Sequence, residues 1–173
     1  PGNYEMPLSA SYRDLIEGKG GGMPEGRTLK AFVPGGSSMP ILMPNQLDTG
    51  LAFEAVVAAG SMAGSGAVIV VDDRTCMVRF ALRTAEFYMH ESCGKCTPCR
   101  EGSLWMKRIT TRMVHGDARA EDGTLLRSVA DQIAGRTICA FGEACSWPTQ
   151  SFLAKFGDEF RAYPGTKSAP RPA

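Results

Sequence analysis

The stretch ESCGKCTPCREG, residues 91–102, carries three cysteines, and two residues separate each cysteine from the next. One tight turn between neighbours brings the thiolates of Cys93, Cys96 and Cys99 within reach of a common centre. Such closely spaced thiolates bind zinc or an iron–sulfur cluster. Pro98 is also well suited to the first turn of a helix. The stretch therefore predicts a metal-binding loop that leads into a helix.

We expect residues after about 72 to be helical, because apolar residues recur there at helical spacing. A helix over about 75–91 has Asp72 or Asp73 as its cap, and a helix over 98–114 has Thr97 as its cap. Two more helices follow over 122–135 and 148–161. The residues expected to face inward are Met77, Phe80, Ala81, Thr84, Phe87 and Tyr88 on the first, Leu126, Val129, Ala130 and Ile133 on the third, and Phe152, Leu153, Phe156 and Phe160 on the fourth.

The first 72 residues are rich in glycine and proline and predict short elements. We expect strands at 4–8, 28–34 and 66–73, the last from its β-branched run, and short helices at 11–18 and 51–60. Ser11 is the expected cap of the first helix, and Gly18 and Gly60 are the expected residues just past the two helix ends. This pattern is typical of a small α+β domain of β-grasp type.

The fold class we predict is therefore α+β, a small β-grasp domain followed by a four-helix bundle that binds an iron–sulfur cluster. The predicted domains are residues 1–72 for the β-grasp domain and 73–163 for the helical domain. The polar, proline-rich residues 164–173 are expected to form a disordered tail. The chain begins with Pro1 rather than methionine, which predicts a fragment or a processed product.

Composition and charge exclude several classes of function. The formal net charge of +1 does not indicate a positively charged surface for binding nucleic acid. No apolar run reaches the roughly 18 residues of a transmembrane helix. Six cysteines without a secretory signal favour metal binding in a reducing compartment over a disulfide framework. The glycine stretches 18–22 and 34–38 lead into no helix, so we interpret both as loops rather than phosphate sites.

A cubane [4Fe–4S] cluster needs a fourth thiolate, and two later cysteines are available. We assign Cys139, which lies between Gly135 and Gly142 in backbone expected to be irregular, and we hold Cys145 in reserve. Cys76 and Cys145 are otherwise expected to be small core residues. A structural zinc site is the alternative, but the second two-cysteine knuckle of such sites is missing.

The surroundings of the three cysteines favour a site that accepts electrons. The helix that begins at Pro98 directs free backbone N–H groups at the site, and Lys95 and Arg100 add positive charge. Hydrogen bonds to sulfur raise a reduction potential. His90, one turn before Cys93, is either a neighbour of the site or a solvated side chain. No thioredoxin-like context supports a thiol–disulfide role.

The segments HESCGKCTPCREG and RTICAFG, about 40 residues apart, resemble the NADH-binding flavoprotein subunit of bacterial and mitochondrial respiratory complex I. The resemblance spans nearly the whole chain. PGNYEMPL is similar to the entry of that subunit's soluble-ligand-binding β-grasp domain. VPGGSSMPIL and AAGSMAGSGAVIVVDD are similar to its later segments, and SWPTQSFLAKF resembles its closing helix.

The resemblance implies that Cys93, Cys96, Cys99 and Cys139 bind one [4Fe–4S] cluster. That cluster takes single electrons from FMN reduced by NADH, as part of an NADH–quinone oxidoreductase, and passes them to the next iron–sulfur centre. A small residue usual in the family at the position of Cys145 supports treating that cysteine as a bystander. FMN and NADH bind in an N-terminal domain that this chain lacks, so the chain alone is not expected to turn over NADH.

The implied partners are that N-terminal domain, the thioredoxin-like 2Fe–2S subunit and the large iron–sulfur subunit of the peripheral arm. In a bacterium this arm lies on the cytoplasmic side of the inner membrane. A diaphorase flavoprotein of a NAD-reducing hydrogenase or formate dehydrogenase shares the cluster motif and is the near alternative. A zinc-stapled interaction module is the alternative of a different class.

Overall fold

The computed structural model describes residues 1–162 of the chain, so the predicted tail 164–173 lies outside the described residues. The chain divides into two units, Pro1–Arg74 and a second that begins at Thr75. The first unit holds a small sheet and short helical segments, and the described part of the second, residues 75–162, is mainly helical. The α+β class predicted from the sequence is confirmed at this level.

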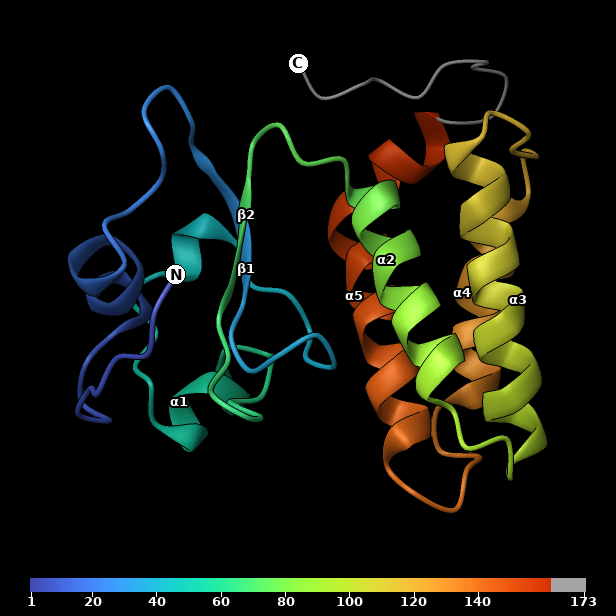
Figure 1. Ribbon diagram of the computed structural model, residues 1–173, viewed down its shortest axis with the longest axis horizontal. Helices are drawn as coiled ribbons and strands as arrows, with labels where there is room; N and C mark the ends of the chain where they lie inside the picture. The colour runs from blue at the N-terminus through green and yellow to red at the C-terminus, as the bar shows by residue number, and fades with distance from the viewer. Residues whose placement is uncertain (163–173) are drawn as a thin grey trace. The chain divides into compact units, whose positions relative to one another are not determined.

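The sheet of the first unit consists of two antiparallel strands, β1 (Leu29–Val33) and β2 (Ile69–Asp72) (Figure 1). Both strands lie within the ranges predicted for them, 28–34 and 66–73, the second from its β-branched run. Isolated bridges link Ser11 to Gly50 and Phe32 to Leu42. The buried core beside the sheet consists of Tyr12, Ile16, Phe32, Leu42, Leu47 and Val56.

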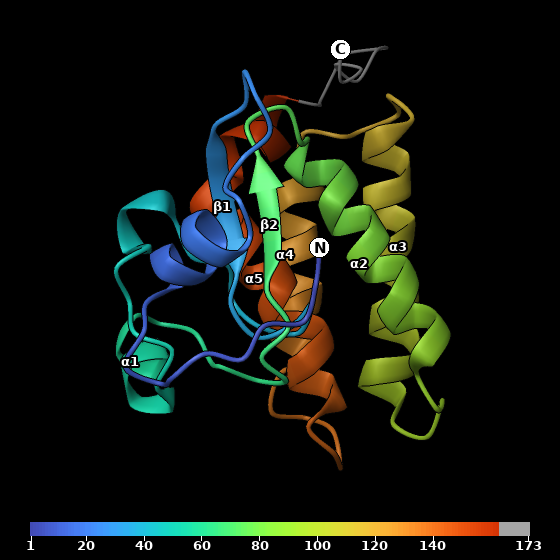
Figure 2. The ribbon, with the colours of Figure 1, turned by 60° about the vertical axis from the view of Figure 1, so that its left-hand side comes forward.

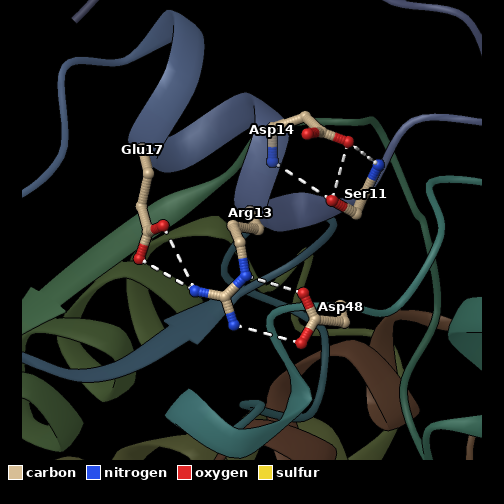
Figure 3. Close-up of polar contacts among 5 residues, drawn as sticks. All are labelled: Ser11, Arg13, Asp14, Glu17 and Asp48. Carbon is tan, nitrogen blue, oxygen red and sulfur yellow. Dashed lines mark hydrogen bonds and ion pairs between the residues drawn. The ribbon is translucent and has the colours of Figure 1, made fainter.

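The first helical segment begins at Ser11, as predicted. The Asp14 N–H donates to Ser11 Oγ at 3.1 Å, and the Ser11 N–H donates back to the Asp14 carboxylate at 2.8 Å (Figure 3). This reciprocal pair satisfies backbone donors that the first turn leaves free. The segment ends later than expected, because Asp14–Lys19 forms a π-helix in which the Gly20 N–H reaches Leu15 O.

Arg13 in this segment forms hydrogen bonds with Asp48, in a loop later in the sequence. Its guanidinium contacts Asp48 through Nε at 2.6 Å and Nη2 at 3.1 Å, and it also contacts Glu17 at 3.2 Å (Figure 3). The pKa of Asp48 is lowered, first by this hydrogen bond from Arg13. The two-pronged contact fixes the orientation of the loop.

The predicted strand at residues 4–8 is wrong, because these residues form no strand. Tyr4 and Leu8 are 43% and 59% exposed, and Pro7 has no backbone N–H to donate to a neighbouring strand. The predicted helix at 51–60 is confirmed as α1 (Phe53–Ala58), and Gly60 follows it with a positive φ of 85°. A 3₁₀ turn, Pro44–Gln46, precedes it.

The second unit contains α2 (Met77–Glu91), α3 (Thr97–Val114), α4 (Asp122–Ile133) and α5 (Phe141–Ala162). Helix α2 packs on α3 and α5, and α4 also packs on α3 and α5 (Figures 1 and 2). All four residues predicted to face inward from α4 are buried, namely Leu126, Val129, Ala130 and Ile133. No helix within residues 1–162 is long and apolar enough to cross a membrane.

The start of α2 differs from the prediction. Neither Asp72 nor Asp73 caps it; Cys76 is the residue before the helix, and the Met77 N–H donates to Glu159 Oε2 on α5 at 2.9 Å. The carboxylate from a neighbouring helix takes the place of a local cap. Four of the residues predicted to face inward from α2 are buried, namely Met77, Ala81, Thr84 and Tyr88, but Phe87 is 51% exposed.

The last helix begins seven residues earlier than predicted. Pro148 lies inside α5 rather than at its start, and the backbone departs from helical geometry at Phe156. Helix α3 likewise begins one residue early, at Thr97, with Cys96 as its cap residue. Because α5 begins at Phe141, Gly142 and Cys145 lie in a helix and not in irregular backbone.

Candidate metal centre

Two loops lie at the same end of the four helices. One joins α2 to α3 and contains Cys93 and Cys96, and the other joins α4 to α5 and contains Cys139 (Figures 1 and 2). The Ile138 N–H donates to Cys96 Sγ at 3.4 Å. This contact joins segments 42 residues apart and brings the residue next to Cys139 against the cysteine triplet. The structure thus brings together the two segments that the sequence singled out.

The first loop presents its three cysteines at different depths. Cys93 is exposed, Cys96 is partly buried and Cys99, in the first turn of α3, is buried. Gly94 has a positive φ of 77°, which a side chain would oppose, and it lets the chain curl between Cys93 and Cys96. Arg100 Nη1 donates to Gly94 O at 2.7 Å, so the following helix holds the curl in place.

Cys139 lies in the bend between α4 and α5 and is exposed. Thr137 Oγ1 donates to Cys139 O at 2.8 Å, which folds the bend back on itself. The Gly135 N–H donates to Glu143 Oε1 at 2.7 Å and ties the start of the bend to the first turn of α5. The bend is therefore held by side chains on both of its sides.

Cys145 lies closer to the triplet than the sequence predicted. It is 1% exposed on α5, and its thiol donates to Gly142 O at 3.3 Å. The pKa of Cys145 is raised to about 12, first by burial and then by the charge of Cys99 and a side-chain hydrogen bond with Cys99. The expectation of a buried core cysteine is met, but the contact with Cys99 was missed, because it depends on the early start of α5.

Ser92 is a second neighbour of the triplet that sequence reasoning missed. Its hydroxyl oxygen lies 3.3 Å from Cys99 Sγ and also accepts the Gly94 N–H at 3.3 Å. Its place directly before Cys93 is the one signal in the sequence that could have indicated this role.

The other residues considered near the site point elsewhere. His90 is 82% exposed in its side chain, with Nδ1 3.0 Å from Glu91 Oε1, which agrees with a solvated histidine. Cys76 stands before the opposite end of α2. Lys95 is exposed beside the triplet, and Arg100 Nε lies 3.0 Å from Glu101 Oε1. Within residues 1–162, no three side chains of His, Cys, Asp or Glu lie close enough together to hold a single metal ion.

A family comparison places the second unit among known proteins. Residues 79–163 match the NADH-ubiquinone oxidoreductase-F iron-sulfur binding region. The chain is 44% identical over 163 residues to the F-2 subunit of NADH-quinone oxidoreductase from Rhizobium meliloti, and 45% identical to the F subunit from Mycobacterium tuberculosis. These alignments cover 94% of this chain but only 39% and 36% of those proteins.

Among solved structures, the crystal structure of an NAD+-reducing [NiFe]-hydrogenase in the air-oxidized state is similar, with a TM-score of 0.82 and 30% identity. That likeness covers 95% of this chain and 28% of the hydrogenase chain. The same region of sequence thus occurs as a minor part of two kinds of larger oxidoreductase. Residues 79–163 of this chain, which include all four predicted ligands, belong to the iron–sulfur binding region of the NADH-ubiquinone oxidoreductase-F family.

Proposed function

We propose that Cys93, Cys96, Cys99 and Cys139 bind one [4Fe–4S] cluster. The observation that carries this proposal is the contact between the Ile138 N–H and Cys96 Sγ, which joins the bend of Cys139 to the triplet. Membership of residues 79–163 in an iron–sulfur binding family supplies the cofactor class. Cys139 is preferred over Cys145 because it is exposed on a bend, whereas Cys145 is buried in α5 with its thiol bonded to Gly142 O.

The residues of the two loops fit such a cluster. Gly94, with its positive φ, lets the chain turn between Cys93 and Cys96, and the Ile138 N–H donates to Cys96 Sγ. When bound, a [4Fe–4S] cluster supplies reversible one-electron transfer. Cys99 is buried, while Cys93 and Cys139 are exposed, so the proposed site lies at the surface of the helical unit.

The larger role that we propose is an electron-transfer module of an NADH–quinone oxidoreductase. The relatives that carry this region are named subunits of that enzyme, and this chain spans less than two fifths of their length. In this proposal electrons come from FMN that NADH has reduced and leave to an iron–sulfur centre in a partner. In this proposal FMN and NADH bind to a part of the flavoprotein outside these 173 residues, and we expect this chain by itself not to oxidise NADH.

The proposed partners are the FMN- and NADH-binding domain, a thioredoxin-like 2Fe–2S subunit and a large iron–sulfur subunit of the peripheral arm, on the cytoplasmic side of a bacterial inner membrane. Residues 1–72 are proposed to be a β-grasp domain and residues 73–163 a four-helix bundle domain. The antiparallel pair of β1 and β2, and the mutual packing of α2 to α5, support these two assignments.

A diaphorase subunit of a NAD-reducing hydrogenase is the second candidate. The structural likeness to such a hydrogenase, with a TM-score of 0.82 over 95% of this chain, is the observation that favours it. The chemistry at the cysteines is the same in both proposals. Subunits that co-purify with the full-length protein from its source distinguish them, since a hydrogenase assembly contains nickel and a quinone reductase does not.

The direction of electron flow is tested by mixing the chain, loaded anaerobically with iron and sulfide, with photochemically reduced FMN. We expect the visible iron–sulfur absorption to decrease by the amount that corresponds to uptake of about one electron per chain. The same chain with Cys139→Ala and Cys96→Ala serves as the control that lacks the site. A loaded chain that dithionite reduces but reduced FMN does not would contradict the proposed electron donor.

A further inference from the structure

We propose that Ser92 is a positioning residue for the cluster-binding thiolate of Cys99, and that its hydroxyl raises the reduction potential of the site. The proposal rests on the proposed [4Fe–4S] function. Ser92 Oγ lies 3.3 Å from Cys99 Sγ across the turn that joins α2 to α3. The cysteine pattern alone does not indicate a role for this serine.

The backbone holds Ser92 firmly in this place. Its own N–H donates to Tyr88 O at 3.1 Å as the last hydrogen bond of α2, and Tyr88 is 4% exposed in the core. The side chain is partly buried. Because the backbone of Ser92 is held by this hydrogen bond and its side chain is short, little conformational entropy is lost when the hydroxyl forms a hydrogen bond with the Cys99 sulfur.

The direction of the hydrogen bond follows from the two neighbours of the hydroxyl. The Gly94 N–H donates to Ser92 Oγ at 3.3 Å, so the oxygen acts as acceptor toward Gly94. A cysteine that binds iron is a thiolate and can only accept a hydrogen bond. The single hydroxyl hydrogen of Ser92 is therefore directed at Cys99 Sγ.

The position of Cys99 makes this bond effective. Cys99 is 7% exposed, whereas Cys93 and Cys139 are exposed, so water competes least at the Cys99 sulfur. A hydrogen bond is electrostatically stronger in such a low-dielectric site. Reduction adds negative charge to the site, and a donor at the sulfur stabilises the reduced form more than the oxidised form. Ser92 should therefore shift the midpoint potential upward.

The test compares Ser92→Thr with Ser92→Val in the full 173-residue chain loaded with iron and sulfide. Threonine and valine have nearly the same shape, and the valine lacks the hydroxyl. We expect the valine variant to have the more negative midpoint potential, by about tenfold in the reduction equilibrium, which corresponds to about 59 mV for one electron. Ser103→Ala is the matched control, because Ser103 is buried on α3 and its hydroxyl donates to Arg100 O.

Each outcome of this comparison decides the proposal. Loss of iron in the valine variant but not in the threonine variant would also support it, since the two differ by the hydroxyl. Equal potentials in the two variants, iron loss in both, or a shift of the same size in Ser103→Ala would overturn it. A wild-type chain that holds zinc and no iron would instead defeat the proposed function, so the two failures are distinguishable.

Discussion

Cys139 and Cys145 lie six residues apart, yet the structure gives them opposite surroundings. Cys139 is exposed on a bend next to the contact with Cys96, and Cys145 is buried with its thiol bonded to Gly142 O. We expect Cys139→Ala to lower the iron content of the loaded chain from about four per chain to three or fewer. Cys145→Ala is the matched control and should leave the iron content unchanged, as measured by colorimetric iron analysis. If Cys145→Ala lowered the iron content and Cys139→Ala did not, the fourth ligand would be Cys145 and not Cys139.

Asp122 is a fully buried carboxylate at the start of α4, and its contribution to the free energy of unfolding depends on pH. Arg112 Nε donates to it at 3.0 Å and the Arg119 N–H at 2.9 Å. Burial by itself would raise the pKa of Asp122, but these hydrogen bonds and the positive charges of both arginines outweigh it and lower the pKa below its usual range. The contribution of Asp122 is therefore fully present above about pH 4, and it is lost as the pH falls through the lowered pKa.

Asp122→Asn tests this assignment. At pH 7 we expect a loss of about 2 kcal/mol in the free energy of unfolding, less than for a fully buried pair because Arg112 is partly exposed. The loss should shrink as the pH is lowered below about 4. Thermal unfolding followed by circular dichroism between pH 3 and 7 measures both effects. Asp158→Asn, which removes an exposed partner of Arg161, should change stability by at most about 0.5 kcal/mol. A pH-independent loss in Asp122→Asn would contradict the account.

At the scale of elements, the packing of α3 on α4 depends on a glycine. Gly102 is buried on α3, and a Cβ there would lie 2.6 Å from Cδ1 and Cγ1 of Ile133, which is 1% exposed on α4. Alanine favours a helix over glycine by about 1 kcal/mol, but overpacking costs about 1–3 kcal/mol. We expect Gly102→Ala to lower the free energy of unfolding in urea by about 1–2 kcal/mol.

The matched control for Gly102 lies on the partner helix. A Cβ at Gly123 on α4 would meet no heavy atom within 4 Å, so Gly123→Ala should leave stability unchanged or raise it by a few tenths of a kcal/mol. A stabilised Gly102→Ala variant would show that α3 and α4 do not pack as described.

Elements with a strong local signal were predictable from the sequence. The buried apolar residues of α4 recur at helical spacing, so they predict a helix. The run of β-branched residues in β2 predicts a strand. The turn that carries Cys93, Cys96 and Cys99 was also predictable, because these cysteines are neighbours in the chain.

Features set by distant contacts were not predictable. The first N–H of α2 is satisfied by Glu159, which is 82 residues away, and not by the nearby Asp72 or Asp73. Helix α5 continues through Pro148, so a proline that marked a helix start in the sequence lies inside the helix. The contact of Cys99 with Cys145 was missed for the same reason, since it joins α3 to the helix α5 that begins earlier than predicted.

At the scale of the whole molecule, residues 1–162 combine a unit with a two-stranded sheet and a unit with four helices, α2 to α5. The predicted ligands all lie in the helical unit, within residues that belong to an iron–sulfur binding family. The first unit contains none of the six cysteines. The central claim is therefore that the helical unit of this chain binds a redox-active cluster.

The most direct test is the iron, acid-labile sulfide and zinc content of the anaerobically purified and reconstituted chain, with EPR spectra before and after reduction by dithionite. The account predicts about four irons and four sulfides per chain, with an EPR signal that appears on reduction. One zinc per chain, with no iron after reconstitution and no signal on reduction, would contradict the account and leave a zinc-stapled structural module.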